Sequence, residues 1–185
     1  MKTLILNGSP RPNGNTVQLI TALKQHLKGE IVELSAYYDN IKPCNDCRAC
    51  WKQPECIIED DMRQIYADDY DIVVIASPVH MSMLPAPMVG VGSRFQTHYA
   101  ASRFLNEKIV CKPKTAVFLL TGGGGGAPTG AIALSKLMFK EMNAKFANER
   151  FVSSLDTDNV PAGEDKAALA KIEEIARELN QAHGL

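Results

Sequence analysis

The chain begins MKTLILNGSPRPNGNTVQL (Met1–Leu19), and this stretch decides the fold. Residues 3–6 are an apolar run that predicts a buried strand, and apolar residues recur at helical spacing after Thr16. A strand that passes through a polar loop into a helix directs the unpaired N–H groups of the first helical turn toward the loop, where anions bind favourably. We therefore interpret the loop as a phosphate-binding site, to which short polar groups and one positive charge are added by Ser9, Arg11, Asn13, Asn15 and Thr16. The alternative is an ordinary βα turn with a good helix cap.

The spacing of this loop excludes two common classes of nucleotide site. A triphosphate-binding loop has four residues between its glycines and a Lys before the Ser/Thr. Here five residues separate Gly8 from Gly14, and Asn15 stands where the Lys would be. The dinucleotide pattern G-x-G-x-x-G is also missing from the loop. A single terminal phosphomonoester is the ligand that remains.

Length and composition indicate one globular domain, residues 1–185. Hydrophobic residues make up 45% of the chain and charged residues 22%, values typical of a folded protein. The 20 Lys and Arg residues nearly balance the 21 Asp and Glu residues, which argues against a nucleic-acid partner. No apolar run is long enough for a signal peptide or a membrane span. We expect a cytoplasmic protein whose cysteines are reduced or hold a metal.

Strands alternate with helices along the rest of the chain. This order predicts a three-layer α/β domain with a five-stranded parallel sheet of order 2-1-3-4-5. Ligands of such sheets bind at the carboxyl ends of the strands, which draws attention to the loops at residues 78–82 and 121–126. The predicted strands are 3–6, 30–34, 71–76, 114–120 and 146–155, and the predicted helices are 16–27, 60–66, 85–104, 132–142 and 164–181.

Residues 37–59 form a cysteine-rich insertion in this pattern. Its spacing is Cys44-x2-Cys47-x2-Cys50-x5-Cys56. Three thiolates at two-residue intervals can wrap one face of an iron–sulfur cluster, and a fourth nearby can complete it. A structural zinc site more often has two such pairs separated by a longer stretch. A [4Fe–4S] cluster is thus favoured over zinc or free thiols, and Cys111 stands apart as a buried apolar residue.

Four motifs together carry a family resemblance. They are Gly8-Ser9-Pro10-Arg11-x-x-Gly14-Asn15-Thr16, the cysteine run that ends in Asp60-Asp61-Met62, Ser77-Pro78-Val79-His80, and Thr121-Gly122-Gly123. In this order and at these intervals the chain resembles the flavodoxin-like NAD(P)H-dependent FMN reductases, and within them the iron–sulfur flavoproteins.

The resemblance implies FMN as cofactor and NAD(P)H as co-substrate. The phosphate would lie at Ser9, Arg11, Asn13, Asn15 and Thr16. The flavin ring would be bordered, partly through main-chain N–H groups, by Pro78, Val79, His80, Met81, Ser82, Thr121, Gly122, Gly123 and Gly124. His80 departs from the family, which commonly has Tyr there. The cluster ligands would be Cys44, Cys47, Cys50 and Cys56, and Asp60 and Asp61 would be structural.

The expected function is therefore an FMN-dependent oxidoreductase that takes hydride from NAD(P)H and passes electrons to an unidentified acceptor, with the [4Fe–4S] cluster as a candidate carrier. The resemblance also implies a homodimer or homotetramer. The alternative is a flavodoxin-type electron carrier with no substrate of its own, although flavodoxins are much more acidic and lack the cysteine run. A signalling receiver domain would need an acidic pair after the first strand, where this chain has Asn7-Gly8-Ser9.

Overall fold

A central parallel sheet organises the molecule. The computed structural model describes all residues, 1–185. Strands β1(Lys2–Asn7), β2(Glu30–Ser35), β3(Ile72–Pro78), β4(Lys114–Thr121) and β6(Phe151–Ser154) pair in parallel in the order β2-β1-β3-β4-β6. A two-residue strand, β5(Ala144–Lys145), pairs with the start of β4. The predicted flavodoxin-like α/β fold and strand order are confirmed, with one short strand added.

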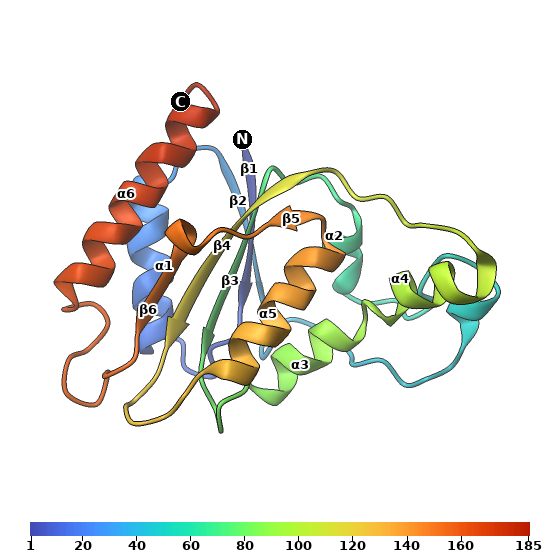
Figure 1. Ribbon diagram of the computed structural model, residues 1–185, viewed down its shortest axis with the longest axis horizontal. Coiled ribbons are helices and arrows are strands. Elements are labelled where there is room, and N and C mark those ends of the chain that lie inside the picture. The colour runs from blue at the N-terminus through green and yellow to red at the C-terminus, as the bar shows by residue number, and fades with distance from the viewer.

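Helices cover both faces of the sheet (Figure 1). Helices α1(Asn15–His26) and α6(Lys166–Ala182) pack on one face against side chains such as Ile5, Val74 and Leu119. Helices α2(Met62–Tyr66), α3(Ala86–Ser93) and α5(Thr129–Glu141) lie on the other face, against side chains such as Leu4 and Phe118. Burial on both faces explains why the central strands are continuous apolar runs in the sequence.

The prediction of one continuous helix over residues 85–104 is wrong. The structure has α3, then α4(Gln96–Ala100), then a π-helical turn η2(Ala101–Leu105). Gly90 and Gly92 lower the helix propensity, and the Ser93 hydroxyl donates back to the Gly90 carbonyl at 2.6 Å, a bond that bends helices. The chain turns at this point and presents Arg94 to the cysteine-rich insertion.

The predicted fifth strand is shorter than expected, because only residues 151–154 of the range 146–155 join the sheet. The chain leaves β5, makes the short helix η3(Asn148–Arg150) and returns to β4 as β6. β5 and β6 thus pair with opposite ends of β4, at Lys114–Thr115 and Phe118–Thr121.

The cysteine-rich insertion forms an arm beside the sheet. It contains the short helix η1(Ala49–Trp51) and extends away from the body together with α4 and η2 (Figure 1). Trp51 stacks on Phe104, with ring centroids 4.1 Å apart, and so joins η1 to η2 within the arm. None of the helices combines the length and apolarity that a membrane span requires.

Candidate functional site

Three loops meet in one cleft at the carboxyl edge of the sheet. The loop after β1, the loop after β3 and the loop after β4 line a cavity of about 350 Å³. Main-chain bonds hold the loops together: the Val79 N–H donates to the Thr121 carbonyl at 2.8 Å, and the Gly122 N–H donates to the Ser154 carbonyl at 2.9 Å. These two N–H groups are already paired. Other groups must therefore donate to any ligand in this part of the cleft.

The first loop fits an anion. Helix α1 begins after Gly14 with no side-chain cap and no acidic residue in its first turn, so its first N–H groups remain available. The alternative of a well-capped βα turn is therefore not what the structure shows. Arg11, which is exposed, also lines the cleft and adds a positive charge.

Three predicted phosphate-site side chains shape the loop through bonds of their own. The Ser9 hydroxyl donates to the Arg11 carbonyl at 2.9 Å, and Asn15 Oδ1 accepts from the Ala162 N–H at 3.0 Å. Thr16 Oγ1 lies 2.7 Å from Thr121 Oγ1 in a buried contact that joins α1 to the end of β4. The main chain of α1 is consequently the better candidate for the phosphate donors, with these side chains fixing its position.

A tight turn forms the second wall. His80 and Met83 exchange two main-chain hydrogen bonds of 2.9 Å, and the residues between them, Met81 and Ser82, have φ of 51° and 64°. Positive φ at both central positions is the geometry of a type I′ turn, which is unusual without Gly or Asn. The Ala131 N–H donates to the Ser82 carbonyl at 2.9 Å and anchors the turn to helix α5.

The cleft contains most of the predicted site residues and adds some. Ser9, Arg11, Asn15, Thr16, Pro78, Val79, His80, Thr121, Gly122 and Gly123 line it, whereas Asn13, Met81, Ser82 and Gly124 do not. Thr157 and Asp158 also line it and were missed. The Thr157 hydroxyl donates to the Gly122 carbonyl at 3.0 Å. Both residues follow the last strand of the sheet, so the rule that placed the other loops at the carboxyl edge also applies to them.

The four clustered cysteines line a second, small cavity. Cys44, Cys47, Cys50 and Cys56 all contribute to its wall, with Trp51 and Arg94. Burial, together with the neighbouring thiols of the other three, raises the pKa of Cys50. Four thiols on one cavity are the donor set of an iron–sulfur site. As placed, no three His, Cys, Asp or Glu side chains are arranged to ligate one metal ion, so loading would require the four thiols to move closer together.

A buried ion pair closes the base of the arm. Arg94 lies 2.5 Å from Asp60, and their side chains are 1% and 0% exposed. The Arg94 guanidinium also donates to the Lys42 carbonyl at 2.8 Å, to the Ile58 carbonyl at 3.3 Å and to Cys56 Sγ at 3.3 Å. Arg94 therefore holds both ends of the cysteine-rich insertion.

Asp60 has the structural role that the sequence predicted. Its carboxylate accepts from the Lys42 N–H at 2.9 Å and from the Met62 N–H at 3.1 Å. Burial alone would raise the pKa of Asp60, but the hydrogen bonds from Arg94 and Lys42 outweigh burial and lower this pKa. Asp61 accepts from the Asn40 N–H at 2.8 Å, so both acidic residues join the end of the cysteine-rich insertion to its beginning.

Comparison with protein families finds one match over most of the chain. A family model described as NADPH-dependent FMN reductase matches residues 1–158. An iron–sulfur flavoprotein of Methanosarcina thermophila is 32% identical over 99 residues, which cover 51% of this chain and 52% of that protein. One of Methanocaldococcus jannaschii is 30% identical over 93 residues, 48% of each chain. The matched regions thus span about half the length of these curated relatives.

Solved structures share the fold at low sequence identity. The NAD(P)H:quinone oxidoreductase from Methanothermobacter marburgensis superimposes with a TM-score of 0.67 at 14% identity, covering 97% of both chains. A Bacillus anthracis FMN-dependent NADH-azoreductase in complex with FMN gives a TM-score of 0.64 at 16% identity, covering 97% of this chain and 99% of that one. At this level of sequence identity, the superpositions show that these proteins share the fold of this chain.

Proposed function

Since this chain belongs to the NADPH-dependent FMN reductase family, we propose that it binds FMN in the three-loop cleft and oxidises NAD(P)H there. The observation that carries the proposal is the convergence of an uncapped helix N-terminus with the loops after β3 and β4 on one cavity of about 350 Å³. A cavity of this size, with main-chain donors at one end, suits a flat cofactor with a terminal phosphate.

The residues of the chain have mostly positional roles in this proposal. The N–H groups of α1 and the Arg11 side chain bind the phosphate, while the Thr16–Thr121 contact fixes the helix against the sheet. The turn at His80–Met83 and the Gly122–Gly123 main chain border the ring. FMN bound there would supply the hydride chemistry itself, with NAD(P)H as the hydride donor. No side chain has to act as an acid or base.

Titration with FMN followed by anaerobic addition of NADPH or NADH tests this function. We expect the protein to take up one FMN per chain, and the flavin absorbance to bleach when the nicotinamide is added. Protein that takes up no FMN contradicts the proposal. Protein that binds FMN but leaves both nicotinamides unoxidised would instead be an electron carrier. Light scattering checks the homodimer or homotetramer that the family resemblance implies.

Replacing Gly130 with Ala should weaken FMN binding by displacing the His80–Met83 turn. A Cβ at this position would overlap Met83 Sδ and come within 2.9 Å of the Ser82 carbonyl oxygen. Overpacking of this kind costs about 1–3 kcal/mol, which corresponds to a loss of affinity of about fivefold to a hundredfold if the cost falls on the bound turn. Quenching of flavin fluorescence measures the affinity.

Gly126→Ala is the matched control for this variant. A Cβ there meets no atom within 4 Å, so FMN affinity should stay unchanged. Equal affinity in the two variants would show that the turn at His80–Met83 does not border the flavin.

We further propose that Cys44, Cys47, Cys50 and Cys56 hold an iron–sulfur cluster that receives electrons from the flavin. Two observations support this proposal: the four thiols line one cavity, and the curated relatives named above are iron–sulfur flavoproteins. When bound, such a cluster accepts electrons one at a time. The protein's own contribution is the buried Arg94 guanidinium, which donates to Cys56 Sγ.

A further inference from the structure

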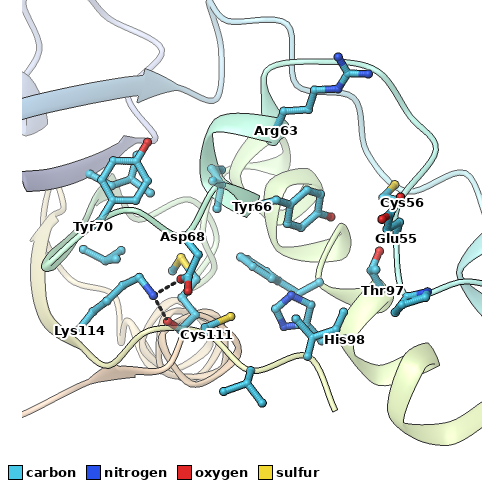
Figure 2. Close-up of a pocket in the computed structure, with 18 residues that line it drawn as sticks. Glu55, Cys56, Arg63, Tyr66, Asp68, Tyr70, Thr97, His98, Cys111 and Lys114 are labelled. Carbon is cyan, nitrogen blue, oxygen red and sulfur yellow. Dashed lines mark hydrogen bonds and ion pairs between the residues drawn. The ribbon is translucent and has the colours of Figure 1, made fainter. Parts of the chain in front are cut away.

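A cavity of about 410 Å³ on the opposite edge of the sheet has no role in the proposed function (Figure 2). It lies beneath residues 109–111, between helices α2 and α4 and the start of β4 at Lys114. It shares no lining residue with the three-loop cleft, which lies at the carboxyl edge. A ligand here would leave the proposed flavin site free.

Aromatic side chains form one wall of this cavity. Tyr66, Phe95 and His98 meet there, with Phe95 and His98 edge to face at 5.4 Å between centroids and Tyr66 and His98 at 6.4 Å. The remaining wall is mainly aliphatic, and Val110 at the mouth is 81% exposed. Such a wall favours a planar ring, which gains edge and face contacts in addition to burial.

The positively charged groups around the cavity are already paired with groups of the protein, and Glu55, an exposed carboxylate in the lining, is the charged group without a partner. The Lys114 ammonium donates to Asp68 and to the Met142 carbonyl at 3.0 Å (Figure 2). It also donates to the Lys112 carbonyl at 2.7 Å, so all three of its protons are used. Arg63 lies 2.7 Å from Glu59 at the surface. An anionic ligand would therefore find no free positive charge, and burying an unpaired charge is costly.

The polar aromatic groups of the wall are also neutral. The Tyr66 hydroxyl donates to the Arg94 carbonyl at 2.8 Å, and burial raises the pKa of Tyr66 to about 12. His98 Nδ1 lies 3.5 Å from Glu141, a carboxylate that by itself would raise the pKa of His98. Burial has the larger effect and lowers this pKa. The cavity is thus an aromatic-lined space with no free positive charge, and its volume is within the roughly 300–1,000 Å³ range of small-molecule sites.

We propose that this cavity is a second ligand site, which takes a neutral planar molecule of one or two aromatic rings. The site does not depend on FMN binding. One wall is formed by Pro54, Glu55 and Cys56, so the occupant lies against the arm that carries the clustered cysteines. Cys111 lies in the opposite part of the lining (Figure 2) and, being outside that cluster, serves as a reporter of occupancy.

A matched pair of probes tests the proposal on FMN-saturated protein. The probes are 2-naphthol, which is neutral at pH 7, and 2-naphthoate, which has the same ring system with a negative charge. At about ten times its Kd, 2-naphthol should slow alkylation of Cys111 by N-ethylmaleimide about tenfold, since the occupied fraction is then about nine-tenths. 2-Naphthoate at the same concentration should leave the rate unchanged. Peptide mass spectrometry resolves Cys111 from the other cysteines, and equal rates with both probes overturn the proposal.

A cavity-filling variant gives a second, independent measurement. Cys111→Phe should weaken 2-naphthol binding, measured by calorimetry, about tenfold or more, because the new ring occupies the space of the ligand. Val160→Phe, at an exposed position remote from the cavity, should leave the binding unchanged. Binding to Cys111→Phe within about twofold of the unsubstituted protein overturns the proposal. If Cys111→Phe does not fold, the alkylation result decides. Flavin absorbance reports FMN occupancy separately, so a failure of the proposed flavin function would be visible as such.

Discussion

Replacing Arg94 with Met is expected to lower the free energy of unfolding by about 3–5 kcal/mol, the usual cost of breaking a buried ion pair. The substitution leaves the Asp60 carboxylate buried without its positive partner and removes the donors to the Lys42 and Ile58 carbonyls. Methionine has a similar length and keeps the packing, so the loss reports the charge and the hydrogen bonds. Urea unfolding followed by circular dichroism measures it.

Two further variants sharpen this test. Arg63→Met removes an exposed arginine whose pair with Glu59 is open to solvent, and should change stability by less than about 1 kcal/mol. The double variant Arg94→Met/Asp60→Asn also removes the unpaired Asp60 charge and should recover part of the lost free energy of unfolding. An Arg94→Met protein within about 1 kcal/mol of the unsubstituted one would show that the arm is held closed by other contacts.

The loss of stability caused by Arg94→Met should also depend on pH. The pKa of Asp60 is lowered in the folded protein from its ordinary value of 3.8. A carboxyl group with a lowered pKa stabilises the fold above the unfolded-state pKa and loses that contribution as the pH falls through the folded-state value. The stability difference between the two proteins should therefore be greatest at neutral pH. It should shrink as the pH falls, first as the unpaired Asp60 of the variant takes up a proton, and then below 3.8 as the unsubstituted protein loses the contribution of its ion pair.

Replacing Cys50 with Ala is expected to abolish iron binding. If the four clustered thiols hold a [4Fe–4S] cluster, removal of one ligand should reduce the iron after anaerobic reconstitution from about four atoms per chain to nearly none. Iron and sulfide analysis, with the visible absorption spectrum, measures the loss. FMN uptake should be unchanged, because Cys50 does not line the three-loop cleft.

Cys111→Ala is the control for this variant, since Cys111 lies outside the cavity that the other four cysteines line. It should retain full iron content. A Cys50→Ala protein that also retains its iron would rule out the proposed ligand set. Zinc in place of iron, or no metal in either protein, would identify the site as a zinc site or a group of free thiols.

The parts of the molecule that depend on local sequence could be predicted. The run Asp71–Ala76 indicates a strand buried on both faces, and the polar loop before Thr16 indicates the entry to a helix. Strand order then places three loops at one edge of the sheet, which is why most of the cleft was foreseen.

The parts that depend on distant contacts could not be predicted in the same way. Arg94 is separated from Lys42 by 52 positions and from Asp60 by 34, and nothing in its local sequence shows that it is buried. The break in the helix predicted over 85–104 has the same origin, because the chain turns where Arg94 reaches the arm. The aromatic-lined cavity combines residues from six regions of the chain and has no sequence signature of its own.

The position of Arg94 has a consequence for how the arm survives changes in its cysteines. Lys42 and Asp60 are 18 positions apart, and holding them together closes a loop at an entropic cost that a disulfide would otherwise have to offset. Here an ion pair and hydrogen bonds make that closure, and neither requires oxidation of a thiol. The loop can therefore stay closed whether its thiols are reduced, oxidised or metal-bound. The folding of the arm does not depend on the redox state of its cysteines.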